Sequence, residues 1–296
     1  MILDGKKTSE KLISEISEEI NKIKDFRKPK MSIILVGNNP ASEVYVKHKL
    51  KSSKKAGIEA ELVRFSESIT QTEIVDKINQ LNNDNNVDGM IVQLPLPKHI
   101  DVDCVINSIS PNKDIDGFHP TNFGKMSLGL DGFRPATPYG ICKLLEDYKI
   151  ETKGKHCVVV GRSNIVGKPI SIMLANDFSI GNCTVTLTHI ETPPDLLKKQ
   201  CQMADIIVVA VGIPNFIDKE MIKEGCIVID VGINKVDDRL CGDVNFVEVS
   251  EKSSWITPVP GGVGPMTIAA LLLNTIKSYK TNYDRFKRIR DMENTK

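Results

Sequence analysis

The sequence predicts an α/β protein with two domains and mainly parallel sheets. Short apolar runs of strand length alternate with helix-length amphipathic segments along the chain. This alternation is typical of doubly wound sheets, in which helices connect parallel strands. The 296 residues match one large domain or two ordinary ones. A stretch rich in Gly, Pro and Asn at 111–138 separates two sets of elements, and we interpret it as a functional crossing between domains.

The first set of elements occupies about the first hundred residues. The segment MSIILVG is apolar and ends in glycine, as a buried strand does. Gly57 is expected to end the second helix, and Thr70 is a possible cap of the third. The expected helices are 8–24, 42–56 and 70–81, and the expected strands are 31–37, 61–65 and 88–97, the last broken by prolines.

The second set follows the crossing and has the same alternation. Its strands are rich in valine and isoleucine, which predicts a buried sheet. The expected strands are 156–161, 184–189, 205–212, 226–232 and 255–259, and the expected helices lie near 138–148, 168–177, 194–202, 218–224 and 265–280. We interpret the charged end of the chain, 281–296, as a solvated tail.

Composition excludes several classes of protein. The net charge of +1 comes from 39 basic and 38 acidic residues, so neither nucleic acid nor a membrane surface is an expected partner. Seven cysteines without a C-x-x-C pair argue against a disulfide framework or a cysteine zinc site, and favour a reducing compartment. The sequence shows no signal core, no presequence and no 18-residue apolar run, so the cytosol is expected.

The segment VVVGRSNIVGKP (158–169) has the form of a phosphate-holding turn but matches neither standard pattern. Five residues separate Gly161 from Gly167, and Pro169 follows Lys168, so it is no P-loop. Ser163 stands where the middle glycine of G-x-G-x-x-G would be. A strand, a glycine turn and a helix starting near the proline would still offer backbone N–H groups to an anion. The alternative is a plain structural turn.

The residues near this turn bear on the choice of cofactor. An NAD-binding unit carries Asp or Glu after its second strand, which bonds the ribose 2′-hydroxyl. Here that strand ends at His189, and Glu191 comes two residues later. Arg162 lies inside the glycine turn and suits a 2′-phosphate. The sequence therefore favours NADP and leaves NAD open.

A few polar residues form a candidate catalytic set. Tyr45 and Lys49 are four residues apart on one helix face, and a lysine with a lowered pKa can transfer protons. Gln93 ends a buried strand, and Asp116 lies in the crossing, where its carboxylate suits an N–H-rich heterocycle. The alternatives are surface neighbours and turn stabilisers. PVPGGVGPMT (258–267), too rich in Gly and Pro for regular structure, is either a rigid connector or a wall against a flat ligand.

Taken together, these segments resemble the bifunctional methylenetetrahydrofolate dehydrogenase/cyclohydrolase family. The matching stretches occur in the order found in the family and cover residues 1 to about 280. They are VGNNPASEVYVKHK, GMIVQLPLPKHI, SPNKDIDGFHPTNFG, VVVGRSNIVGKP, ADIIVVAVGIP, VIDVGIN and TPVPGGVGPMT. The individual motifs are short, but so many in one order are specific to this family.

The resemblance implies two domains that flank a cleft. A catalytic folate-binding domain would comprise residues 1–120 and 265–296, with the last helix packed back on it, and a Rossmann-like NADP-binding domain residues 121–264. Folate would lie against Tyr45, Lys49, Gln93, Leu94, Asp116, Pro260, Gly261, Gly262, Val263, Gly264, Pro265 and Ile268. The nicotinamide cofactor would use Gly161, Arg162, Ser163, Ile190 and Ile233. The family further implies a homodimer and no metal.

The resemblance also implies two reactions. Hydride transfer from 5,10-methylenetetrahydrofolate to NADP⁺ gives the 5,10-methenyl compound, and water opens this to 10-formyltetrahydrofolate. The implied catalytic residues are Lys49 for proton handling, Gln93 to hold or tune it, Tyr45 to position the ring and Asp116 to anchor the pterin. Ser42 would support the start of the helix or this network.

Two positions depart from the family pattern. Ala136 stands where many members have cysteine, and Ile190 stands where a small hydroxyl residue often helps to hold the 2′-phosphate. The NADP preference therefore depends on Arg162. The competing hypotheses are an NAD-dependent enzyme of the same family and a nucleotide-binding relative without catalysis.

Overall fold

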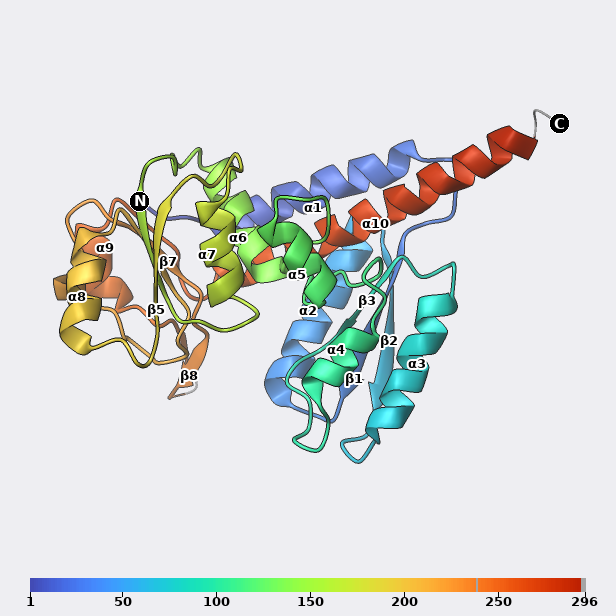
Figure 1. Cartoon of the computed structure of the whole chain (residues 1–296), viewed down its shortest axis with the longest axis horizontal. Coiled ribbons are helices and arrows are strands. Elements are labelled where there is room, and N and C mark those ends of the chain that lie inside the picture. The colour runs from blue at the N-terminus through green and yellow to red at the C-terminus, as the bar shows by residue number, and fades with distance from the viewer. Residues whose placement is uncertain (238, 294–296) are drawn as a thin grey trace. The chain divides into compact units, whose positions relative to one another are not determined.

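The computed structural model describes residues 1–237 and 239–293, which form two compact units (Figure 1). We call them the five-stranded unit and the three-stranded unit after their sheets. The five-stranded unit contains Met1–Glu10, Lys125–Asp131 and Thr137–Ala270, and the three-stranded unit contains Lys11–Gly124, Gly132–Ala136 and Leu271–Lys296. Four helices contribute residues to both units: α1 (Gly5–Lys22), α5 (Pro120–Ser127), α10 (Val263–Glu293) and, by its first residue alone, α6 (Ala136–Asp147).

The five-stranded unit is built on a parallel sheet with the order β10-β7-β6-β4-β5. Its strands are β4 (His156–Val160), β5 (Thr184–Thr188), β6 (Ile206–Val209), β7 (Ile227–Asp230) and β10 (Trp255–Ile256). All four residues of β6 are buried, as the continuous apolar run of this strand predicts. The predicted parallel α/β architecture is confirmed.

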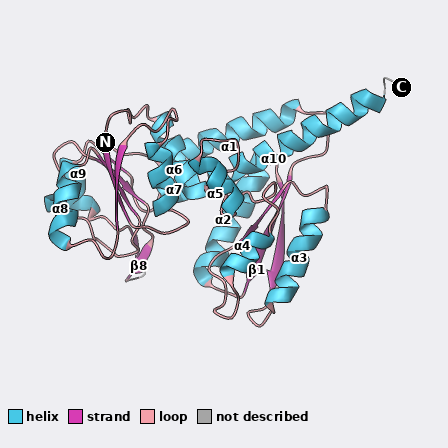
Figure 2. Cartoon of the chain, in the orientation of Figure 1, coloured by secondary structure: helices cyan, strands magenta, loops and turns pink. Residues whose placement is uncertain are grey.

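Helices cover both faces of this sheet, with α6 and α7 on one side and α8 and α9 on the other (Figure 2). Their bounds are Ala136–Asp147 for α6, Gly167–Ala175 for α7, Pro194–Met203 for α8 and Phe246–Lys252 for α9. The helix expected at 218–224 is wrong, because only a single 3₁₀ turn forms over Lys219–Met221. Ile222 leaves this turn in an extended conformation and is buried in the core, which a continued helix would prevent.

The three-stranded unit has a parallel sheet with the order β2-β1-β3. Its strands are β1 (Lys30–Val36), β2 (Glu59–Phe65) and β3 (Gly89–Val92), and its helices include α2 (Pro40–Ala56), α3 (Gln71–Asn83) and α4 (Val102–Ser108). Apolar residues of α3 and α4 pack together with those of β1 and β3 in one core cluster. The sheet is therefore covered by helices as predicted, although α4 and α9 were not expected.

The predicted helix boundaries are confirmed where capping residues mark them. Gly57 ends α2 in the left-handed conformation (φ 81°), which glycine adopts without steric cost. Thr70 caps α3 in a capping box, in which its hydroxyl accepts from the Glu73 N–H and the Glu73 carboxylate accepts from the Thr70 N–H. Asn39 caps α2, because its side chain accepts from the N–H groups of Ala41 and Ser42.

In two segments, the amino-acid composition led us to expect no regular structure, but the structure contains helices there. The Gly- and Pro-rich stretch 111–138 contains α5 and the start of α6, and the charged segment 281–293 continues α10. The expected tail is therefore helical, although most of its residues as far as Met292 are exposed to solvent as predicted; residues 294–296 lie outside the described residues. Phe26 explains the longer helix, because its ring lies 5.0–5.6 Å from those of Tyr279, Tyr283 and Phe286 on α10. A short antiparallel hairpin, β8 (Asn234–Val236) with β9 (Arg239–Cys241), was also not predicted. Within the described ranges, no helix is long and apolar enough to cross a membrane.

Candidate active site

The predicted site residues divide between the two units. The candidate catalytic residues Tyr45, Lys49, Gln93 and Asp116, together with Leu94, all belong to the three-stranded unit. The glycine turn, Ile190, Ile233 and the segment 260–268 all belong to the five-stranded unit.

Lys49 and Gln93 are brought together by α2 and the end of β3. Lys49 Nζ donates to Gln93 Oε1 at 3.0 Å, and Gln93 Nε2 donates to the carbonyl oxygen of Leu94 at 2.8 Å. The Gln93 backbone N–H continues the sheet by donating to Ile34 O at 2.8 Å. The amide is thus held at both ends, and its oxygen is the atom that faces the lysine.

The surroundings of Lys49 favour its neutral form. The residue is only 6% exposed, and burial lowers the pKa of its ammonium group, while the negative charge of Asp116 partly opposes this. In turn, burial raises the pKa of Asp116, and the charge of Lys49 opposes that increase. Among the described residues, only Gln93 hydrogen bonds to Lys49 Nζ. An amine held by a neutral amide, instead of a carboxylate, can release its proton and take it back.

Tyr45 lies one helical turn before Lys49 on α2, at the spacing that places two side chains on the same face. Its ring is partly buried, and burial raises the pKa of its hydroxyl, so the group stays protonated at neutral pH. Ser42 is also buried on this helix, but the cap of α2 is Asn39 and not Ser42. Tyr45 therefore offers an aromatic face and a neutral hydroxyl beside the amine.

Asp116 is positioned by a second carboxylate that the sequence did not single out. Asp114 is 1% exposed, and its oxygens accept from the N–H groups of Gly117 (3.1 Å) and His119 (2.8 Å) and from Asn122 Nδ2 (2.9 Å). Gly117 has φ 75°, and a Cβ there would lie 2.5 Å from the backbone of Arg134. The pattern D-x-D-G, typical of turns in which Asp bonds its own backbone, was the available signal.

The glycine turn of the five-stranded unit is closed by backbone contacts. Gly161 has φ 117°, and a Cβ there would lie 2.3 Å from Ala210 O; a Cβ at Gly167 would lie 1.9 Å from Gly161 O. Helix α7 begins at Gly167, two residues before Pro169. Ser163 Oγ accepts from the N–H groups of Val166 (3.1 Å) and Gly167 (3.3 Å), so the hydroxyl stabilises the turn just before α7, and its own O–H can donate to a ligand.

The remaining candidate cofactor residues lie on the surface of the same unit. Arg162 and Ser163 are exposed, as are Ile190 (85%) and Ile233 (46%). Lys168, the residue that suggested a P-loop, donates to Asn164 Oδ1 at 2.8 Å and so stays within the turn. The turn therefore presents glycine backbone, one hydroxyl and one guanidinium group to a ligand.

The segment 258–267 is partly helical, contrary to the expectation that its glycines and prolines exclude regular structure. Pro260 follows a cis peptide bond, and Gly261 has φ 109°. Helix α10 then starts at Val263, so Gly264, Pro265 and Ile268 are helical. Pro265 is tolerated because it lies in the first helical turn, where its missing N–H costs no hydrogen bond.

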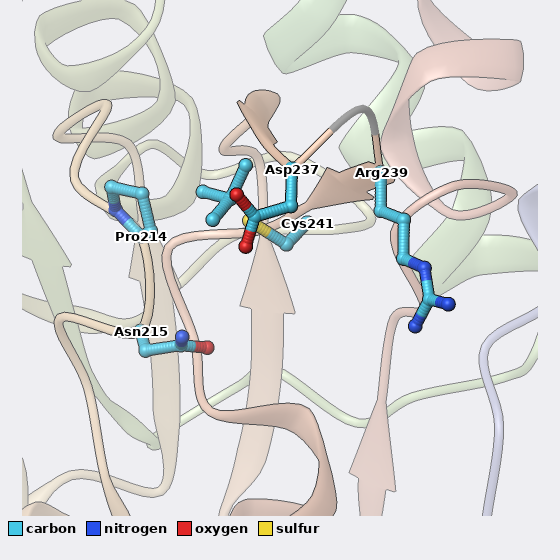
Figure 3. A pocket seen from close by; sticks show the side chains of 6 residues that line it. Pro214, Asn215, Asp237, Arg239 and Cys241 are labelled. Carbon is cyan, nitrogen blue, oxygen red and sulfur yellow. The ribbon is translucent and has the colours of Figure 1, made fainter.

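A hollow of about 550 Å³ lies elsewhere in the five-stranded unit, beside the β8–β9 hairpin (Figure 3). It is lined by Pro214, Asn215, Val236, Asp237, Arg239 and Cys241. None of the predicted site residues lines it, and we assign no ligand to it. Among residues 1–237 and 239–293, no group of three or more His, Cys, Asp or Glu side chains is placed to hold a metal ion.

A parallel sheet with a glycine turn that leads into a helix defines the five-stranded unit as a Rossmann-like dinucleotide-binding domain. The chain belongs to the tetrahydrofolate dehydrogenase/cyclohydrolase family. Residues 3–116 match the model of the catalytic domain of this family, and residues 135–283 match the model of its NAD(P)-binding domain. The predicted family is thus confirmed.

Similar proteins of known name agree with this assignment. Bifunctional protein FolD 1 of Geobacter metallireducens is 59% identical over 286 residues, which cover 96% of this chain and 99% of the relative. The bifunctional FolD enzyme of Campylobacter jejuni has a TM-score of 0.91 and 49% identity, covering 95% of this chain and 99% of that one. The dehydrogenase-cyclohydrolase of Trypanosoma brucei, solved with NADP and an inhibitor, has a TM-score of 0.91 and 34% identity, covering 96% and 98%.

Proposed function

We propose that this protein oxidises 5,10-methylenetetrahydrofolate with NADP⁺ and hydrolyses the methenyl product to 10-formyltetrahydrofolate. Family membership supports both activities, because the relatives named above are bifunctional and models of both domains match this chain. The observation that carries the proposal is the buried Lys49, whose amine is held by the Gln93 amide at 3.0 Å. A protein that only bound nucleotides would have no need of a buried, ionisable amine in its other unit.

We propose that folate binds the three-stranded unit through the side chains of Tyr45, Lys49, Gln93 and Asp116 and the backbone of Leu94. Asp116 carries a carboxylate held by the Asp114 turn, and a carboxylate can accept two N–H groups of a pterin ring. Tyr45 offers an aromatic face to a flat ring. The residues 260–265 and Ile268, which belong to the five-stranded unit, are proposed as folate-binding residues from the family resemblance alone.

The glycine turn fits a dinucleotide. Side chains at Gly161 and Gly167 would strike the backbone of the turn, so the turn keeps its compact form only with glycines, and a phosphate can approach its backbone closely. Ser163 would donate its hydroxyl to a phosphate oxygen, and Arg162 would pair with the 2′-phosphate. Ile190 and Ile233 would contact apolar parts of the cofactor. When bound there, NADP⁺ supplies the hydride acceptor.

In the dehydrogenase step, the main task of the protein is to align the hydride-donating carbon of the folate with the hydride acceptor. The hydride leaves a carbon between two nitrogens whose lone pairs stabilise the cation that forms, so no protein base is required. The residues around the folate therefore contribute by holding this carbon in position, which lowers the entropic cost of the reaction. Tyr45 and Asp116 are the side chains placed for this role.

The cyclohydrolase step requires proton handling, for which Lys49 is suited. Water adds to the methenyl carbon and loses one proton, which the Lys49 amine accepts. One C–N bond of the bridge then breaks: the ring nitrogen takes up a proton from the resulting ammonium group, while the added hydroxyl becomes the formyl C=O and releases its own proton to solvent. Gln93 Oε1 accepts from Lys49 Nζ in both protonation states, so it keeps the amine in place throughout. Burial lowers the pKa of Lys49, which favours the neutral amine that starts the cycle.

One experiment tests the whole proposal. The purified chain is supplied with 5,10-methylenetetrahydrofolate and either NADP⁺ or NAD⁺, and reduced cofactor and the methenyl chromophore are followed separately. We expect cofactor reduction with NADP⁺, together with formation and decay of the methenyl compound. No turnover with either cofactor would contradict the enzymatic function, and faster turnover with NAD⁺ would favour the NAD-dependent alternative.

We also propose that the protein is a homodimer in a reducing compartment such as the cytosol. All seven cysteines are free thiols, and five of them are buried, which agrees with a compartment that keeps thiols reduced. The dimer is proposed from the family resemblance. Light scattering tests it directly, because a measured mass of one chain at micromolar concentration would contradict it.

A further inference from the structure

One carboxylate of the five-stranded unit ties together the loops that follow two adjacent strands. Asp243 comes shortly after β9 and is completely buried (0% exposed). Its Oδ2 accepts from the N–H groups of Val211 (2.7 Å) and Gly212 (2.9 Å), just beyond the end of β6. Its Oδ1 accepts from Asn234 Nδ2 (2.8 Å), beyond the end of β7. Both loops leave the carboxyl edge of the sheet, where dinucleotides bind.

A second buried carboxylate holds Asp243 in this place. Asp230, the last residue of β7, accepts from the N–H groups of Asp243 (2.9 Å) and Gly232 (3.0 Å) with Oδ1 and from that of Val244 (3.0 Å) with Oδ2. A Cβ at Gly242 would lie 1.8 Å from Asp230 Oδ2, and one at Gly232 would lie 2.2 Å from Asp243 Oδ1. The two carboxylates thus reach the backbone because glycines stand beside them.

The loop held by Asp243 packs directly against the glycine turn. Ala210, which precedes Val211, presents its carbonyl oxygen 2.3 Å from where a Cβ of Gly161 would be. Gly161 O in turn lies 1.9 Å from where a Cβ of Gly167, the first residue of α7, would be. These contacts leave no free space, so a shift of residues 210–212 must move the glycine turn as well.

We infer that Asp243 is a positioning residue for NADP⁺: it fixes the loops after β6 and β7 and thereby holds the glycine turn in the form that receives the dinucleotide. The inference rests on the proposed NADP-dependent function. A buried carboxylate is costly unless hydrogen bonds stabilise it, and here each oxygen accepts from a loop next to the candidate cofactor site. Asp243 acts through the backbone of Gly161 and need not touch the cofactor.

The test compares Asp243→Asn with the wild type as full chains. Asparagine keeps the size of the side chain but places an N–H donor against other N–H donors. We expect NADP⁺ affinity, measured by calorimetry, to weaken on the order of 10-fold to 100-fold, with a matching rise in KM and a smaller change in kcat. The cyclohydrolase rate, measured with the methenyl compound and no cofactor, should stay within about twofold, because Lys49 and Gln93, the residues proposed to handle its protons, lie in the other unit.

Asp205→Asn is the matched control. Asp205 accepts from the His156 N–H at 2.8 Å, at the amino edge of the same sheet, so its loss removes a similar bond far from the glycine turn. This variant should bind NADP⁺ like the wild type. If Asp243→Asn also binds it normally, or loses both activities in equal proportion, the positioning role is wrong.

Asn234→Ala covers the case in which Asp243→Asn does not fold, because it removes only one bond to the carboxylate. It should weaken NADP⁺ binding on the order of threefold, as expected for one hydrogen bond. Unchanged affinity in a folded Asn234→Ala protein would overturn the inference. A wild type that fails to bind NADP⁺ would instead contradict the proposed function, and the inference with it.

Discussion

Two lysines lie in the two candidate ligand sites, and their surroundings are opposite. Lys49 is 6% exposed and is held by a neutral amide, whereas Lys168 is exposed and donates to Asn164 within its own turn. Lys168 belongs to the segment that looks like a phosphate-binding motif, whereas Lys49 lies outside any such motif and has a pKa lowered by burial. The comparison shows that burial, and not the motif, makes a lysine suitable for proton transfer.

The same contrast applies to the two sites as a whole. The site of the three-stranded unit depends on ionisable side chains, chiefly Lys49 and Asp116, whose pKa values are shifted by burial. The glycine turn depends on backbone geometry, since Gly161 and Gly167 leave no room for side chains. Substitutions should therefore affect chemistry in the first site and binding in the second.

The largest expected effect is that of Lys49→Met on methenyl hydrolysis. Loss of a general base typically costs on the order of 10²-fold to 10⁴-fold, and methionine keeps the length of the side chain without its amine. NADP⁺ binding should be unchanged. Decay of the methenyl chromophore measures the effect, and Lys168→Met is the control that should hydrolyse normally. An equal loss of hydrolysis in Lys49→Met and Lys168→Met would contradict the claim that only Lys49 takes part in the reaction.

The pH dependence of hydrolysis should follow the lowered pKa of Lys49. The rate should rise about tenfold per pH unit while the amine is mostly protonated, and level off at a lower pH than an ordinary lysine would give. The free energy of unfolding should also increase with pH between the folded and unfolded pKa values, because the unfolded chain binds the proton more tightly. Lys49→Met should lose this part of the pH dependence. A rate profile of the same shape in the wild type and in Lys49→Met would argue against the role of Lys49.

Arg162→Ala should change the choice between cofactors. A charged hydrogen bond contributes about 1.5–3 kcal/mol, so KM for NADP⁺ should rise on the order of tenfold or more, while KM for NAD⁺ stays the same. Steady-state assays with both cofactors measure this directly. Glu191→Ala is the counterpart: if it weakens NAD⁺ binding and Arg162→Ala leaves NADP⁺ unaffected, the predicted preference is reversed.

The smallest expected effects are those of Ser163, whose hydroxyl both stabilises the turn before α7 and is a candidate phosphate ligand. Ser163→Ala should lower the free energy of unfolding by about 1 kcal/mol, because the Val166 and Gly167 N–H groups lose their acceptor. It should also weaken NADP⁺ binding on the order of threefold to tenfold, since the hydroxyl is lost. Denaturant unfolding and calorimetry separate the two roles; unchanged stability of Ser163→Ala would contradict the role of the hydroxyl in the turn.

Local patterns predicted most elements, and they failed where distant contacts decide the structure. Thr70 and Gly57 marked helix ends correctly because capping depends on neighbours within one turn. The end of α10 was missed because the Phe26 ring, far away in sequence, stabilises its charged last turns. The helix predicted at 218–224 was too long, because the burial of Ile222 in the core ends the helical turn after Met221 despite the helical periodicity of the sequence.

By itself, the sequence determined the two alternating sets of elements, the family and the identity of Lys49, Gln93 and Asp116 as candidates. These depend on periodicity and on residue types, which are local properties. Only the tertiary structure decided that Lys49 is buried against Gln93 and that Asp243 reaches Val211. The partners in each pair are more than thirty residues apart, and a pKa or a loop position depends on which groups folding brings together in a poorly solvated interior.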